Sequence, residues 1–196
     1  MGTKGEQTKT KMIQAMADSL ETLGYSATGM NEIVKVTDSP KGSLYFHFPG
    51  GKEELASQAL AYTGEEMGKE FAELLKSAKS PSQGILKIFQ VLEERILQSN
   101  FTKGCPIATT ALETAVENNQ VNKTCSAIFT SWVDKLSVYL QANKIQAKRA
   151  KELSFSIISL WEGAVLLSKT NKNTEPLKSA SKTAEFLIHS ELSKNK

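Results

Sequence analysis

The chain has 196 residues, of which 40% are hydrophobic and 23% charged, and its formal net charge is +3. This length fits one helical domain or a small head with a larger body, and so mild a charge neither requires nor excludes a nucleic-acid partner. A polar start, no apolar run near the ~18 residues of a membrane span, and only two cysteines predict a cytoplasmic protein with reduced thiols and no membrane partner.

The first predicted helix covers residues 8–23. Its apolar residues recur at helical spacing and would share one face: Ile13, Met16, Leu20 and Leu23. Gly24 is a natural C-terminal stop, because glycine readily takes the left-handed conformation found there. Tyr25 would then fill the core of a small head.

The stretch over residues 28–54 predicts a helix-turn-helix. Three apolar residues at helical spacing give a short first helix one apolar face: Met30, Ile33 and Val34. Thr37 and Asp38 end it. Ser39 is a favourable N-cap and Pro40 a favourable first residue, so a second helix should begin there. Two short helices joined in this way can place the second one in the major groove of DNA.

The second helix carries side chains that suit contact with DNA. Lys41, Gly42 and Ser43 lie at its start, where free N–H groups attract phosphate. Lys41 can reach a phosphate or a guanine edge, and Gly42 lets the helix approach closely. The polar tips of Tyr45 and His47 can hydrogen-bond the DNA backbone.

Other residues of this stretch are predicted to hold it in place. We expect Leu44 to point toward the core, and Phe46 and Phe48 to act as hydrophobic anchors. Thr28 stands where it would cap the first short helix, and its hydroxyl could also meet a phosphate.

The run PKGSLYFHF and the Gly-Lys-Glu after it, with Thr28 and Ile33 before it, resemble the DNA-binding domain of TetR/AcrR-type transcriptional repressors. The motif covers about a quarter of the chain. The alternative is an elbow between helices in an unrelated all-helical protein, which would not need Lys, Gly, Ser, Tyr and His in this order.

The motif departs from the usual family pattern at three places. Pro40 replaces a Ser, Asp38 replaces the turn Gly, and Gly50 with Gly51 lengthens the exit by one residue. The PKG and PGGK variants are similar to those of the lincomycin-resistance regulator branch.

The resemblance implies an all-α fold. An N-terminal three-helix helix-turn-helix domain would occupy residues 1–50, and a C-terminal helical ligand-binding and dimerisation domain residues 51–196. It also implies which residues meet DNA: Thr28, Pro40, Lys41, Gly42, Ser43, Tyr45, His47 and Lys52.

Apolar spacing predicts six helices beyond the head, over residues 52–77, 81–100, 105–117, 121–142, 147–169 and 175–192. Ser80 to Gln83 forms a capping box with Pro81 at the first helical position. The apolar stripe of the helix over residues 52–77 shifts along its length, so we expect this helix to link the two domains mechanically.

The helix over residues 147–169 is apolar on two faces. The second face carries Ile158, Trp161 and Val165, and the first holds five residues at heptad-like spacing: Leu153, Ile157, Leu160, Ala164 and Leu167. Such a helix needs two partners. One would be its own domain, and the other the same helix pair of a second copy. The alternative is a fully buried helix in a monomer, but the resemblance favours a homodimer.

A repressor also needs a signal. An apolar pocket for a small hydrophobic inducer would be lined by aromatic residues and one methionine: Met67, Phe101, Phe129, Trp132, Phe155 and Trp161. The alternative is that aromatic residues at helical spacing are simply core.

Cys105 lies between Gly104 and Pro106 at a predicted helix start, where a thiolate is stabilised and can react with oxidants or electrophiles. Some TetR-type repressors that look similar here sense such compounds, and by that resemblance Lys169 would match a lysine near the sensing thiol. The alternative makes Cys105 a small buried hydrophobe and Lys169 a solvated helix end. Cys125 falls on an apolar face and is interpreted as core.

These features favour a dimeric repressor that binds operator DNA and is released by a small-molecule inducer. The alternative is a repressor switched by oxidation or adduction at Cys105. An enzyme is disfavoured, because there is no nucleophile elbow, phosphate loop or metal-spaced His/Cys cluster, and we expect neither cofactor nor metal. A helical adaptor without DNA binding is the third class.

Overall fold

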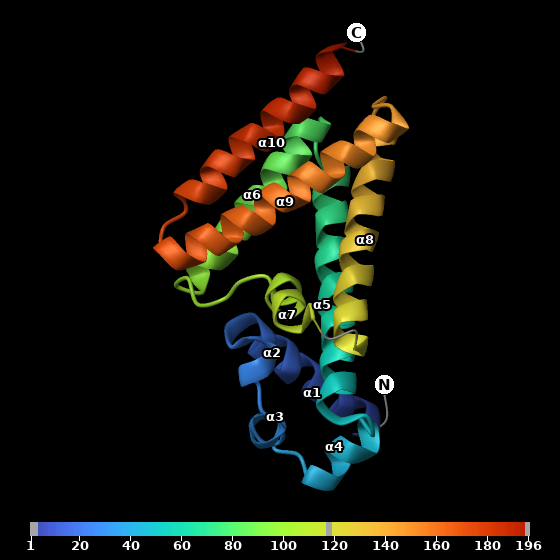
Figure 1. Cartoon of the computed structure of the whole chain (residues 1–196), viewed down its shortest axis with the longest axis vertical. Coiled ribbons are helices and arrows are strands. Elements are labelled where there is room, and N and C mark those ends of the chain that lie inside the picture. The colour runs from blue at the N-terminus through green and yellow to red at the C-terminus, as the bar shows by residue number, and fades with distance from the viewer. Residues whose placement is uncertain (1–3, 117–118, 195–196) are drawn as a thin grey trace. The chain divides into compact units, whose positions relative to one another are not determined.

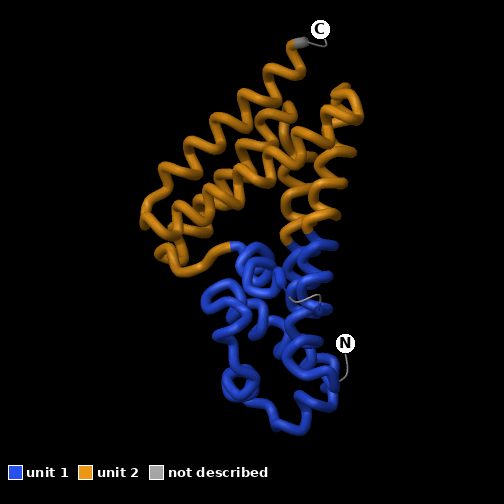
Figure 2. Tube along the Cα trace, in the orientation of Figure 1, with its two compact units in different colours: residues 1–66, 105–128 blue, residues 67–104, 129–196 orange. Residues whose placement is uncertain are grey.

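The computed structural model describes residues 4–116 and 119–194, and in these ranges it contains ten α-helices and no strand (Figure 1). The predicted all-α fold is confirmed. The chain clusters into two compact units (Figure 2). Unit 1 holds residues 1–66 and 105–128, and unit 2 holds residues 67–104 and 129–196. The boundary predicted at residue 50 separates a DNA-binding part from a ligand-binding part by function, and it stays a prediction.

Unit 1 begins with four helices: α1 (Lys4–Thr22), α2 (Gly24–Ala27), α3 (Met30–Val36) and α4 (Lys41–His47). The core of α1 is Met12, Met16 and Leu20, which are fully buried. Leu23 is 56% exposed, so its predicted place on the buried face is wrong. The chain turns away from α1 at Gly24, whose φ of +80° is left-handed, and enters α2, which the sequence did not predict.

Unit 1 is completed by α7 (Pro106–Thr114) and by the first parts of α5 (Gly51–Lys76) and α8 (Gln120–Ala142). Helix α7 packs on α1 and α2. Its Glu113 carboxylate accepts a hydrogen bond of 2.8 Å from the backbone N–H of Ser26 in α2. The predicted end of this helix at Glu117 lies outside the described residues.

Unit 2 holds the later parts of α5 and α8, together with α6 (Pro81–Gln98), α9 (Ala147–Asn171) and α10 (Glu175–Lys194). Helix α10 packs on α6 and α9, as Figure 1 shows. The Ser80 hydroxyl accepts a hydrogen bond from the backbone N–H of Gln83, so the predicted N-cap of α6 is confirmed.

The second apolar face predicted for α9, with Ile158, Trp161 and Val165, is buried within unit 2. The first face is buried at Leu153, Ile157 and Ala164, but Leu167 is 52% exposed, so this face is partly open. The predicted contact of α9 with a second copy stays a prediction. A third face of α9 is open as well, where Phe155 is 56% and Leu166 59% exposed.

Candidate nucleic-acid interface and ligand cavity

Helix α4 is held to the core by Leu44 and by Phe48, the residue that caps its C-terminus. Leu44 and Phe48 are fully buried, and Ile33 of α3 is 1% exposed. The turn between the helices runs through Asp38, whose φ of 48° is left-handed. The two short helices and their turn form the predicted helix-turn-helix. Only one side of its second helix packs against the rest of the protein.

The start of α4 differs from the prediction by one residue. Pro40 occupies the N-cap position with a ψ of 140°, and the helix begins at Lys41. The Ser39 hydroxyl lies 3.2 Å from the carbonyl of Thr37, to which it donates, so Ser39 does not cap the helix. Proline has a fixed φ and no N–H to donate, so the sequence favours it at the first helical position, but here it stands one residue earlier.

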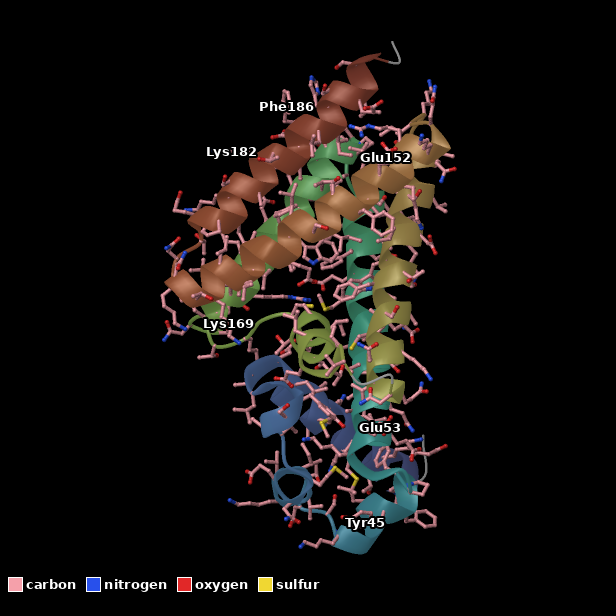
Figure 3. The ribbon with its side chains drawn as sticks, in the orientation of Figure 1. Tyr45, Glu53, Glu152, Lys169, Lys182 and Phe186 are labelled. Carbon is pink, nitrogen blue, oxygen red and sulfur yellow. The ribbon has the colours of Figure 1, made fainter. Side chains whose placement is uncertain are left out.

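The outer face of α4 combines a cation, an open glycine and two aromatic rings. Lys41 and Gly42 are exposed, and a Cβ built at Gly42 would meet no atom within 4 Å. Tyr45, labelled in Figure 3, is 60% exposed. Phe46 is 81% exposed, so its predicted role as an anchor is wrong. Ser43 and His47 are half-buried at the edges of this face.

Thr28 and Lys52 are engaged within unit 1. Thr28 is 2% exposed and donates its hydroxyl proton to the carbonyl of Gly24 at 2.6 Å, and the residue that caps α3 is Gly29. The Lys52 ammonium donates to the carbonyl of Ser26 and lies 4.5 Å from the ring centroid of Tyr25. Burial lowers the pKa of Lys52, and the Glu113 carboxylate opposes that shift. The predicted contacts of both residues with DNA stay predictions.

Unit 2 contains an apolar cavity of about 250 Å³. Helices α5, α6, α8 and α9 line it with twelve residues: Gly68, Phe71, Ala72, Leu75, Lys76, Ile88, Trp132, Lys135, Leu136, Tyr139, Ile158 and Trp161. Two of the residues predicted for a pocket, Trp132 and Trp161, are brought together here with ring centroids 5.6 Å apart. Phe71 meets Trp161 edge-on at 5.2 Å.

The other residues predicted for this pocket lie outside the lining. Phe129 packs edge-on against Trp132, Phe101 follows α6 with a φ of 59°, and Met67 is buried. Phe155 is exposed beneath the Lys151 ammonium and does not line this cavity. The sequence missed Phe71, which its spacing assigned only to the apolar stripe of α5.

The two cysteines lie in different surroundings within unit 1. Cys105 is 9% exposed at the N-cap of α7, and its sulfur accepts a hydrogen bond from the backbone N–H of Ala108 at 3.4 Å. Cys125 is fully buried in α8, and burial raises the pKa of its thiol to about 11. The interpretation of Cys125 as core is correct.

Lys169 is half-buried at the end of α9 in unit 2. Its Nζ atom lies 3.6 Å from the position that a Cβ on Gly104 would take. Burial lowers the pKa of Lys169, and the neighbouring ammonium of Lys172 lowers it further. Its predicted role beside a sensing thiol stays a prediction.

Metal sites and membrane-spanning segments are both absent from the described residues. No group of three or more His, Cys, Asp or Glu side chains there has the arrangement needed to hold a metal ion. None of the helices in those ranges has the length and apolar character that crossing a membrane demands.

A helix-turn-helix whose second helix faces outward is the arrangement with which many transcriptional regulators bind DNA. Residues 13–59 match the family described as bacterial regulatory proteins, tetR family. Residues 81–183 match the LmrA/YxaF-like transcriptional regulator C-terminal domain. The chain belongs to the TetR family of transcriptional regulators, and it is not an enzyme.

Relatives from Bacillus subtilis match over most of their length. The chain is 32% identical over 169 residues to the HTH-type transcriptional regulator LmrA, covering 86% of this chain and 90% of that protein. It is 33% identical over 177 residues to the HTH-type transcriptional regulator YxaF, covering 90% and 92%. A solved TetR transcriptional regulator from Chloroflexus aurantiacus is 28% identical with a TM-score of 0.80, over 95% of this chain and 96% of that one.

Proposed function

We propose that the protein is a homodimeric repressor that binds operator DNA through α4 and leaves it when a small molecule binds. The observation that carries this proposal is the one-sided burial of α4. Leu44 and Phe48 hold the helix to the protein, while Lys41, Tyr45 and Phe46 face outward. A short helix presented in this way can enter the major groove.

Each outward residue of α4 has a distinct task in this proposal. Lys41 neutralises a phosphate or reaches a guanine edge, and Tyr45 hydrogen-bonds the backbone. The absence of a side chain at Gly42 lets the helix come close to the groove. Phe46 is an apolar surface of the kind that contacts a thymine methyl group. Pro40, Ser43 and His47 border this surface, and we assign them supporting contacts.

The dimer is proposed from the open side of α9, formed by Leu167 and the third face, together with the neighbouring helix α10. Four large apolar side chains are more than half exposed there: Phe155, Leu166, Leu167 and Phe186. Phe186 is labelled on α10 in Figure 3. Exposed apolar side chains on adjoining helices mark an interface, and a second copy would offer the same pair of helices. Two heads would then reach half-sites about 34–36 Å apart.

Release is proposed to act through α5. This helix begins at Gly51, close in sequence to α4, and its later residues Gly68, Phe71 and Leu75 line the cavity of unit 2. A ligand that shifts the later part of α5 would therefore move its first turn. The heads would lose their register with successive grooves, and the operator would be released.

A second candidate function is a redox-sensing repressor, favoured by the place of α7. The helix starts at Cys105, whose sulfur already accepts an N–H bond, a geometry that favours thiolate. Its Glu113 carboxylate holds the Ser26 N–H of α2. Hypochlorous acid would convert the thiolate to sulfenic acid and release chloride, and a shift of α7 would reach the DNA-binding head through that bond.

The proposal is tested by DNase I footprinting on the DNA upstream of the protein's own gene. We expect a two-fold symmetric protected region that Lys41→Ala weakens at least tenfold in protein concentration. Equal protection by Lys41→Ala, or no protected region at any concentration, would contradict it. Treatment with hypochlorite, with Cys105→Ser as the control, distinguishes a noncovalent inducer from oxidation of Cys105. Only the redox switch predicts that hypochlorite releases the wild-type protein from DNA and leaves the Cys105→Ser variant bound.

A further inference from the structure

The walls of the unit 2 cavity are aromatic and buried. Phe71, Trp132 and Trp161 are 5%, 5% and 3% exposed. The ring of Trp161 contacts both others, with centroid distances of 5.2 Å to Phe71 and 5.6 Å to Trp132. Such rings prefer offset or edge-to-face contacts with a further ring. The volume of about 250 Å³ lies just below the range of about 300–1,000 Å³ that small-molecule sites usually have, which favours one or two fused rings.

The rim of the cavity is cationic. Lys76 and Lys135 are the charged residues of the lining, both are exposed, and no carboxylate lines the cavity. Neither ammonium belongs to a salt bridge within the described ranges. The Nζ of Lys135 lies 3.6 Å from the position that a Cβ on Gly68 would take, so this ammonium stands directly over the cavity wall.

Tyr139 adds no negative charge to this surface. Its hydroxyl donates to the carbonyl of Leu75 at 3.3 Å, and burial raises its pKa, so the phenol is neutral at pH 7. An anion at the rim would thus meet two ammonium groups. The lining itself holds no carboxylate, and the Glu162 carboxylate outside the lining accepts a hydrogen bond from the indole N–H of Trp161 at 2.7 Å. Because the lysines are exposed, neither pays a large desolvation cost before the ligand arrives.

We infer that this cavity binds a small, flat aromatic compound that carries one anionic group. Its rings would lie against Phe71, Trp132 and Trp161, and its anion would point to Lys76 and Lys135. The inference rests on the proposed function for its regulatory meaning, but binding itself can be measured without DNA.

The two tryptophans of the chain both line the cavity, so intrinsic fluorescence reports its occupancy directly. We would titrate the full-length protein at pH 7 with 2-naphthoate and with 2-naphthamide, which share the ring system and differ in charge. We expect saturable quenching with a Kd at least fivefold lower for the naphthoate. In the Lys76→Gln/Lys135→Gln double variant this preference should fall to below twofold.

Lys182→Gln is the matched control, because Lys182 is an exposed lysine of α10 that does not line the cavity. It should keep the full preference, and all variants should keep the thermal unfolding midpoint of the wild type. Equal affinity for the two probes, no saturable binding of either, or a preference that survives loss of both lysines would overturn the inference. Binding of naphthoate without any effect on a bound operator would leave it standing and overturn the proposed release.

Discussion

At the scale of single residues, Phe46 and Cys125 differ in exposure: the ring of Phe46 faces outward, and the thiol of Cys125 is buried. Phe46 contributes almost no buried surface to the fold, since it is 81% exposed. Cys125 is fully buried and makes no contact with solvent. Replacing Phe46 therefore tests a role in DNA binding, and chemical modification of Cys125 tests its place in the core.

Phe46→Ala should leave the urea unfolding midpoint unchanged, because a side chain this exposed buries little apolar area to lose. It should weaken operator binding by about 1 kcal/mol, the order of burying one methyl group, if the ring meets a thymine methyl. Replacing single operator thymines by uracil removes only that methyl. At the contacted position we expect wild type to lose affinity and Phe46→Ala to lose none.

Cys125 should resist alkylation in the folded protein. Because burial raises the pKa of its thiol to about 11, the thiolate is scarce throughout pH 7–9. Mass spectrometry after iodoacetamide should find Cys125 unmodified until urea unfolds the chain. Modification of Cys125 at the same rate in folded and unfolded protein would show that the site is open.

The sequence predicted the direction of Leu44 and Lys41 but not that of Phe46. Two aromatic residues at positions 46 and 48 look alike in a pattern, yet in a helix they lie roughly 200° apart. With Phe48 buried, Phe46 must face outward. Thr28 was similarly mistaken for a cap, because α2 places the Gly24 carbonyl within reach of its hydroxyl.

At the scale of elements, α5 and α8 approach each other closely at Gly64. A Cβ built there would stand 2.7 Å from Cγ2 of Ile128 and 3.0 Å from two further atoms of that side chain. Real Cβ contacts are not this short, and a β-branched side chain has few rotamers to escape into. The missing side chain at Gly64 therefore allows α5 and α8 to pack closely at this point.

Gly64→Ala should therefore destabilise the protein by about 1–2 kcal/mol, because overpacking outweighs the gain of up to about 1 kcal/mol in helix propensity. Gly42→Ala is the matched control, since its Cβ meets nothing. It should be neutral or slightly stabilising. Urea unfolding followed by circular dichroism measures both, and a stabilising Gly64→Ala would contradict the close contact.

The boundaries of the helices show which local sequence signals are sufficient to predict where a helix begins. The Ser80 cap with Pro81 located the start of α6, because the hydroxyl and the fixed φ act within one turn. The four residues of α2 were missed, since so short a helix has no apolar period to detect. The cavity could not be derived either, because spacing along one helix does not tell which of its rings face a void.

At the scale of the whole molecule, the proposed dimer depends on the open face of α9. Leu166→Glu places a charge among exposed apolar side chains and should convert the dimer to monomer in sedimentation velocity, with an unchanged helical spectrum. Leu112→Glu is the control, because Leu112 is 76% exposed on α7 outside the proposed interface. Equal dimerisation of both variants would place the interface elsewhere.

The central claim is that the outer face of α4 reads operator DNA. The most direct measurement is fluorescence anisotropy of a labelled upstream duplex, with a scrambled duplex of equal length for comparison. We predict that wild type prefers the upstream duplex by at least 100-fold at about 0.15 M salt. Lys41→Ala/Tyr45→Ala should lose most of that preference while it keeps its fold and its dimer. Equal preference in the double variant, or no DNA binding by wild type, would contradict the account.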